Sequence, residues 1–124
     1  HAALDFASAA MAGQLSISGG SISQPHAGYQ AIHFQMPVVG PVSIADAAIS
    51  SGNTAILIED LRAPLSLTNV KATATSVGQG LSIIALTAAA TSISISGGAF
   101  TGAHRGIYFP GADAATTISS PAFQ

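Results

Sequence analysis

The sequence lacks cysteine and contains few charged residues. Because none of its 124 residues is cysteine, disulfide bonds, thiolate catalysis and thiolate zinc sites are excluded. Three basic residues are too few to neutralise a nucleic-acid backbone, so we expect no nucleic-acid partner. No uninterrupted apolar run approaches the roughly 18 residues of a membrane-spanning helix, so we expect no membrane insertion.

Charge is so scarce that small side chains must form most of the surface. Only 6% of the chain is charged, whereas about a quarter of a soluble protein usually is. Ser, Thr, Gly and Ala must therefore cover most of the exterior. High hydrophobicity combined with low charge is the reverse of a disordered composition, and the length suits one domain over residues 1–124.

A phrase of alternating apolar and small residues recurs along the chain. Its clearest copies are SISGGSI at 16–22 and SISGGAF at 94–100, with weaker copies beginning at residues 43 and 66. A second phrase, seen as AIHF and later as GIYF, lies between the copies. Alternation with a period of two is typical of strands. The aligned apolar positions are Ile17, Ile44, Leu67, Ile95 and Ile118 in the first phrase, and Leu4, Ile32, Ile56, Leu81 and Ile107 in the second.

Every copy of the first phrase is interrupted at the same place. Most of the residues there are types that tolerate a left-handed backbone, which a tight corner requires. A helix over the Ala-rich segment 87–91 is not favoured, because β-branched residues dominate and apolar spacings of three and four are not sustained. We therefore expect one tight corner per repeat, at Gly19, Asp46, Asn69, Gly97 and Ser120.

This pattern resembles the right-handed parallel β-helix of the pectate-lyase-like superfamily. In both, an apolar–x–apolar strand is followed by a Gly or Asn turn, an apolar residue, a loop, and a Gly–apolar–x–apolar strand. The resemblance implies an all-β solenoid of about five rungs, each with three short strands, whose stacked repeats bury a continuous core. A left-handed hexapeptide helix fits worse, because it requires a repeat of roughly 18 residues.

One outer column of the second phrase collects ionisable and aromatic residues: Asp5, His33, Leu57, Ser82 and Tyr108. Neighbouring segments add His26, Tyr29, His104, Arg105, Glu59, Asp60 and Arg62. In the superfamily that the sequence resembles, this face commonly forms a groove for an extended polysaccharide. Planar rings stack on sugars, and polar side chains bind their hydroxyls. The residues expected to bind carbohydrate are Tyr29, His33, His104, Arg105 and Tyr108.

The same face offers two candidate catalytic carboxylates, Asp5 and Glu59. Adjacent rungs lie about 4.8 Å apart, so Asp5 could orient His33 as a base. The two carboxylates lie two rungs apart, which leaves the pair of an inverting glycosidase open. The Asp-rich calcium cluster of pectate lyases and the signature blocks of polygalacturonases are missing, and the histidines lack metal-ligand spacing. We expect no metal and no cofactor.

The predicted strands fill nearly the whole sequence and leave no room for polar end caps. We therefore expect a segment of a larger assembly, most like the shaft of a phage tailspike or virion fibre. Such a shaft is extracellular or on the virion surface, is usually a homotrimer, and contacts cell-surface polysaccharide. One alternative is a segment of an extracellular polysaccharide lyase, glycoside hydrolase or epimerase. Another is an adhesion or ice-binding solenoid, which would use the flat face of Ser16, Ser43, Ser66, Ser94 and Thr117.

Overall fold

The computed structural model describes residues 4–6, 14–84, 92–102, 105–108, 115–119 and 122–123. Every regular element in these ranges is a strand, and each strand pairs in parallel with the strand one repeat away. None of the described residues belongs to a helix long and apolar enough to cross a membrane. The expected all-β, parallel β-helical fold is therefore confirmed.

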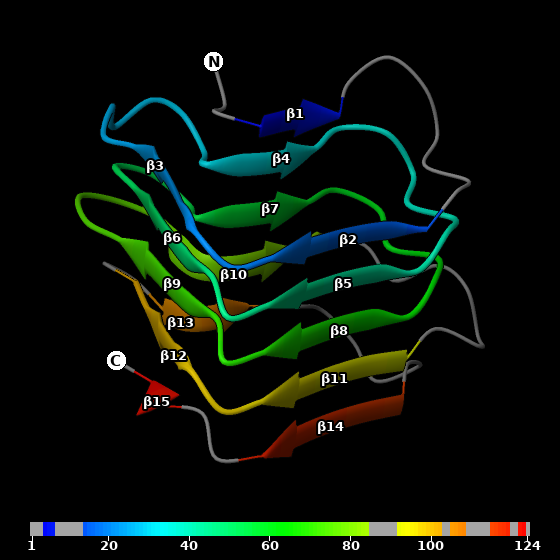
Figure 1. Ribbon diagram of the computed structural model, residues 1–124. Coiled ribbons are helices and arrows are strands. Elements are labelled where there is room, and N and C mark those ends of the chain that lie inside the picture. The colour runs from blue at the N-terminus through cyan, green and yellow to red at the C-terminus, as the bar shows by residue number, and fades with distance from the viewer. Residues whose placement is uncertain are drawn as a thin grey trace.

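The described strands form three parallel sheets around one interior (Figure 1). The first sheet contains β1 (Leu4–Phe6), β4 (Ile32–Phe34), β7 (Ile56–Ile58), β10 (Gln79–Ile83) and β13 (Arg105–Tyr108). The second contains β2 (Leu15–Ser18), β5 (Val42–Ala45), β8 (Leu65–Thr68), β11 (Ser92–Ser96) and β14 (Ala115–Ser119). The third contains β3 (Ser21–Gln24), β6 (Ala48–Ser51), β9 (Lys71–Ala74), β12 (Ala99–Thr101) and β15 (Ala122–Phe123).

The number of turns differs from the expected five rungs. Residues 14–84 are described without a break, and they complete about three turns, from β2 to β10. Strands on either side extend every sheet to five strands, but the segments 7–13 and 85–91 that join them to the continuous part lie outside the described residues. The Ala-rich segment 87–91 is among these, so the choice of strand over helix there stays a prediction.

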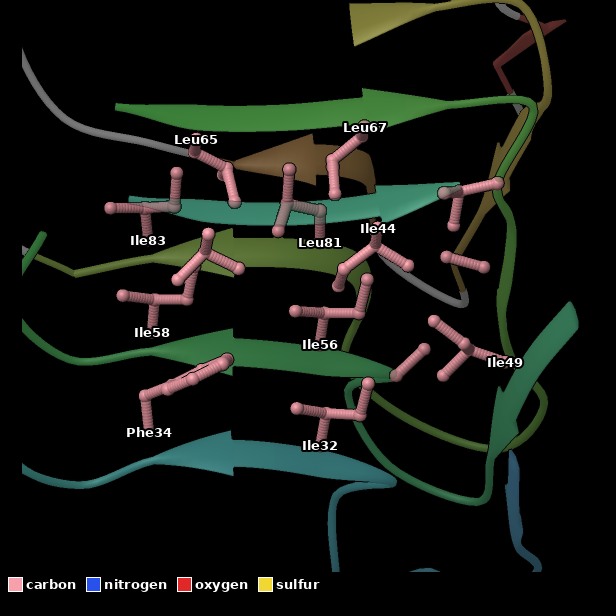
Figure 2. Close-up of a cluster of buried hydrophobic side chains, with 14 of the residues drawn as sticks. Ile32, Phe34, Ile44, Ile49, Ile56, Ile58, Leu65, Leu67, Leu81 and Ile83 are labelled. Carbon is pink, nitrogen blue, oxygen red and sulfur yellow. The ribbon is translucent and has the colours of Figure 1, made fainter. Parts of the chain in front are cut away.

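Like apolar residues stack in files inside the coil. The backbone register places Ile17, Ile44, Leu67, Ile95 and Ile118 opposite one another on successive strands of the second sheet. Figure 2 shows Phe34, Ile58 and Ile83 in one file of the first sheet, beside a second file that faces Leu67 and Ile44. Ile44, Leu67 and Ile95 are fully buried, and each such side chain contributes about 1.5–3 kcal/mol through removal from water. The predicted interior file is confirmed for these three residues and for Ile17, which packs against them partly buried; the side chain of Ile118 lies outside the described residues.

The corners between the second and third sheets adopt the backbone expected from their residues. Asp46 and Asn69 have φ angles of 54° and 52°, and Gly19 and Gly97 have 76° and 66°. Ser120, the fifth expected corner, lies outside the described residues. The Asn69 side-chain amide donates a hydrogen bond to Asp46 Oδ1 at 3.3 Å, which links two corners on adjacent rungs. Left-handed residues at one place in the repeat therefore set the angle between two sheets.

Candidate carbohydrate-binding face

The column predicted for the first sheet is aligned as expected, but it is not exposed along its whole length, because Ser82 is buried and Leu57 is only partly exposed. Asp5, His33, Leu57, Ser82 and Tyr108 are register partners on β1, β4, β7, β10 and β13. We call the outer side of these strands the first-sheet face. The outward orientation of His33 follows from strand alternation, because the residues on either side of it are buried while His33 is partly exposed. The carbohydrate-binding role of the column stays a prediction.

His33 and Glu59 form the closest polar contact on this face. The His33 imidazole donates from Nε2 to Glu59 Oε2 at 2.6 Å. The His33 side chain is only 16% exposed, whereas that of Glu59 is 43% exposed. Glu59 follows β7 directly, two residues beyond the register partner of His33. The contact is therefore diagonal across adjacent rungs, and the carboxylate holds the imidazole in a fixed orientation.

Asp5 has a different partner from the one expected. Asp5 and His33 are register neighbours, as predicted, but the Gln35 amide donates to both Asp5 carboxylate oxygens, at 2.8 and 2.9 Å. This contact repeats the diagonal geometry of the His33–Glu59 contact, because Gln35 also lies two residues beyond the register partner. Gln35 was missed by the sequence analysis. Its position two residues after His33, on the same side of an alternating strand, is the signal that could have identified it.

Arg105 and Tyr108 form the aromatic end of the face. The Arg105 guanidinium carbon lies 5.0 Å from the centroid of the Tyr108 ring, within the range of a cation–π contact. Tyr108 is 38% exposed, so it is partly accessible to solvent although the guanidinium lies over its ring. His104, also predicted to bind carbohydrate, lies outside the described residues.

Tyr29 lies in the turn that leads from β3 to β4. Its ring centroid is 4.8 Å from that of His26, and the two planes are tilted by 37°. His26 Nδ1 accepts a hydrogen bond from the Gly28 backbone N–H at 3.0 Å, and the Ser51 hydroxyl donates to the Tyr29 carbonyl at 2.7 Å. Tyr29 is 38% exposed. The turn therefore holds a partly exposed aromatic ring in a defined position, tied to the end of β6 on the third sheet.

The remaining ionisable residues near this face form a local pair. The Arg62 guanidinium donates to Asp60 Oδ2 from Nε at 2.9 Å and from Nη2 at 2.7 Å. Both side chains flank Leu61, which forms an isolated parallel bridge with Val38, so the pair lies on the segment that joins β7 to β8. Within the part of the chain that the structure describes, no three His, Asp or Glu side chains form a group that could hold a metal ion.

The face thus combines polar pairs on its early rungs with an exposed aromatic ring on β13. Carboxylate, imidazole and amide groups offer hydrogen-bond donors and acceptors to hydroxyl-rich ligands, and tyrosine rings offer flat apolar surfaces. No protein-family model matches the chain, and no curated protein or solved structure gives a significant match. The fold therefore rests on the structure itself, and the function must be argued from these side chains.

Proposed function

We propose that this chain is a β-helical shaft segment of a tailspike-like or virion fibre protein, related to the pectate-lyase-like superfamily, and that its first-sheet face binds a cell-surface polysaccharide. The observation that carries the proposal is the register of this column, which places the polar Asp5 and His33 at one end and the aromatic Tyr108 at the other, on one side of one sheet. His33 and Tyr108 are three rungs apart, or roughly 14 Å at the usual strand spacing. That length suits several linked sugars better than one ring.

The proposed binding chemistry divides the face into two parts. The exposed Tyr108 ring, held by Arg105, stacks against the apolar side of a sugar. The His33–Glu59 and Asp5–Gln35 pairs hydrogen-bond to sugar hydroxyls, and their existing contacts reduce the side-chain entropy lost on binding. The face is therefore preorganised at both ends of the described column.

Replacing Tyr108 with alanine tests this proposal on a glycan array. We expect wild-type protein to retain at least one extended polysaccharide, and Tyr108→Ala to bind it about tenfold more weakly, because a stacking contact contributes about 1 kcal/mol or somewhat more. The control is Ser66→Ala, on the second sheet, which should bind as wild type does. Absence of glycan binding by the wild-type protein would overturn the proposal.

We also propose that the chain assembles with copies of itself, as a trimeric shaft does. The second sheet supports this, because its outward column of Ser16, Ser43, Ser66 and Ser94 carries no charge. Charged side chains normally keep such surfaces apart. Solution scattering should give the mass of three chains, and the mass of a single chain would contradict this part of the proposal.

An enzyme of the same superfamily is the second candidate, and the short His33–Glu59 contact is what favours it. A carboxylate that orients an imidazole is an arrangement suited to a general base. The shaft proposal predicts that the chain releases no products from an acidic polysaccharide. Product release that is lost in both His33→Ala and Glu59→Gln, and retained in Ser66→Ala, would favour the enzyme instead.

A further inference from the structure

The outer side of the third sheet is hollowed over three consecutive rungs. The hollow has a volume of about 320 Å³ and lies across β3, β6 and β9, which Figure 1 shows side by side. We call it the third-sheet groove. Its volume is at the lower end of the range for small-molecule sites. It is lined by the apolar residues Ile22, Ala48 and Ile49 and by the polar residues Ser21, Ser23, Ser50, Lys71, Thr73 and Thr75.

The strand register arranges these side chains in rows across the groove. Ser23, Ser50 and Thr73 are register partners, so three hydroxyls lie on adjacent rungs. Each hydroxyl can donate one hydrogen bond and accept others. In the neighbouring row Ala48 lies between Ser21 and Lys71, and its short side chain leaves an apolar floor. A hydroxyl rim beside an apolar floor matches a sugar ring, which has hydroxyls at its edge and C–H groups on its faces.

Lys71 supplies the charge of the groove. It is the only lysine in the sequence, and its side chain is exposed. The ion pairs found among the described residues join His33 to Glu59 and Arg62 to Asp60, and neither includes Lys71. Asp46, at the corner of the adjacent rung, accepts a hydrogen bond from Asn69 and, among the described residues, forms no ion pair with Lys71. The ammonium group is therefore available to an external anion.

From this arrangement we infer that the third-sheet groove binds one anionic sugar unit. The negative group of the sugar pairs with Lys71, its hydroxyls bond to the Ser23, Ser50 and Thr73 row, and one of its faces lies on Ala48. This site is on a different sheet from the first-sheet face and does not depend on the polysaccharide site proposed there. The same chemistry is available from a free sugar acid and from one unit of an acidic polysaccharide.

Amide NMR spectra recorded during titration with sodium glucuronate at low ionic strength test the inference, with glucose as the uncharged probe. We expect glucuronate to shift amide signals of β3, β6 and β9, and glucose to bind about fivefold more weakly, which is the size of one exposed charge contact. Lys71→Met should weaken glucuronate binding by a similar factor, and Lys71→Arg should retain it. Because Lys71 is exposed, the spectra should show both variants folded.

Three results would overturn the inference. They are an absence of shifts on β3, β6 and β9, equal binding of glucose and glucuronate, and unchanged binding by Lys71→Met.

A short polyuronate, used as a third probe, separates the two sources of the ligand. Tighter binding than glucuronate on the same strands indicates a unit of a polymer, and equal binding indicates the free sugar. Tyr108→Ala should leave all these titrations unchanged, so failure of the first-sheet proposal is distinguishable from failure of this one.

Discussion

Replacing Phe34 with alanine is expected to lower the free energy of unfolding by about 3–5 kcal/mol. Phe34 is fully buried on β4, in one file with Ile58 and Ile83 (Figure 2). Its removal would leave a cavity between rungs that the stiff stacked strands cannot close. Small domains have a total stability of only about 5–15 kcal/mol, so the loss is a large part of the whole. Thermal unfolding should shift downward by more than about 10 °C.

Tyr108→Ala is the matched control for this prediction. It also removes an aromatic side chain from a strand of the first sheet, but from the exposed outer side. Substitutions at exposed positions usually change stability by no more than about 0.5 kcal/mol, and loss of the Arg105 contact adds a similar amount. Equal destabilisation by the two substitutions would mean that the assignment of inner and outer sides is wrong.

Gly98→Ala is expected to be strongly destabilising, whereas Gly20→Ala is not. Both glycines follow the first corner residue and have nearly the same φ angle, 78° and 75°. A Cβ on Gly20 would meet nothing within 4 Å, but one on Gly98 would collide with the carbonyl oxygen of Val70. That oxygen accepts the backbone hydrogen bond from Ala99 at 3.0 Å, so the collision would disturb the pairing of adjacent rungs.

The two glycine variants separate backbone strain from steric collision. Gly20→Ala should cost about 1–2 kcal/mol, the strain of a left-handed non-glycine residue. Gly98→Ala should lower the free energy of unfolding by at least about 2 kcal/mol more, because backbone atoms of the preceding rung must also move. Urea denaturation of both variants measures the difference. Equal costs would indicate that the rungs are not stacked as closely at this corner as the structure shows.

The fold could be predicted from the sequence because two simple signals coincide in every repeat. Alternation places Ile17, Ile44 and Leu67 on one side of their strands, and a residue that tolerates positive φ follows at a fixed distance. Register in a parallel solenoid follows directly from aligning such copies. The number of turns was predicted less well. Counting repeats gives the number of strands in each sheet, but it does not show how many of those strands belong to one continuous coil.

The contacts of the candidate site could be predicted only in part. Alternation correctly placed His33 and Tyr108 on the outer side, but it does not show which neighbour a long side chain reaches. His33 bonds diagonally to Glu59 rather than to its register neighbour Asp5, which bonds to Gln35 instead. The third-sheet groove was missed for another reason. Its Ser and Thr residues look the same in sequence as those of a flat face, and only the shape of the sheet makes a hollow there.

Formation of a disulfide between engineered cysteines tests the stacking of rungs most directly, since the chain has no cysteine of its own. Ser66 and Ser94 are register partners on β8 and β11, and strand spacing of about 4.8 Å falls within the Cα separation of a disulfide. Ser66→Cys with Ser94→Cys should therefore form an intramolecular bond under mild oxidation. The control, Ser66→Cys with Ser96→Cys, has its Cα atoms roughly 8 Å apart and should form none. A bond in the second pair, or none in the first, would contradict the stacked register on which both proposed sugar sites depend.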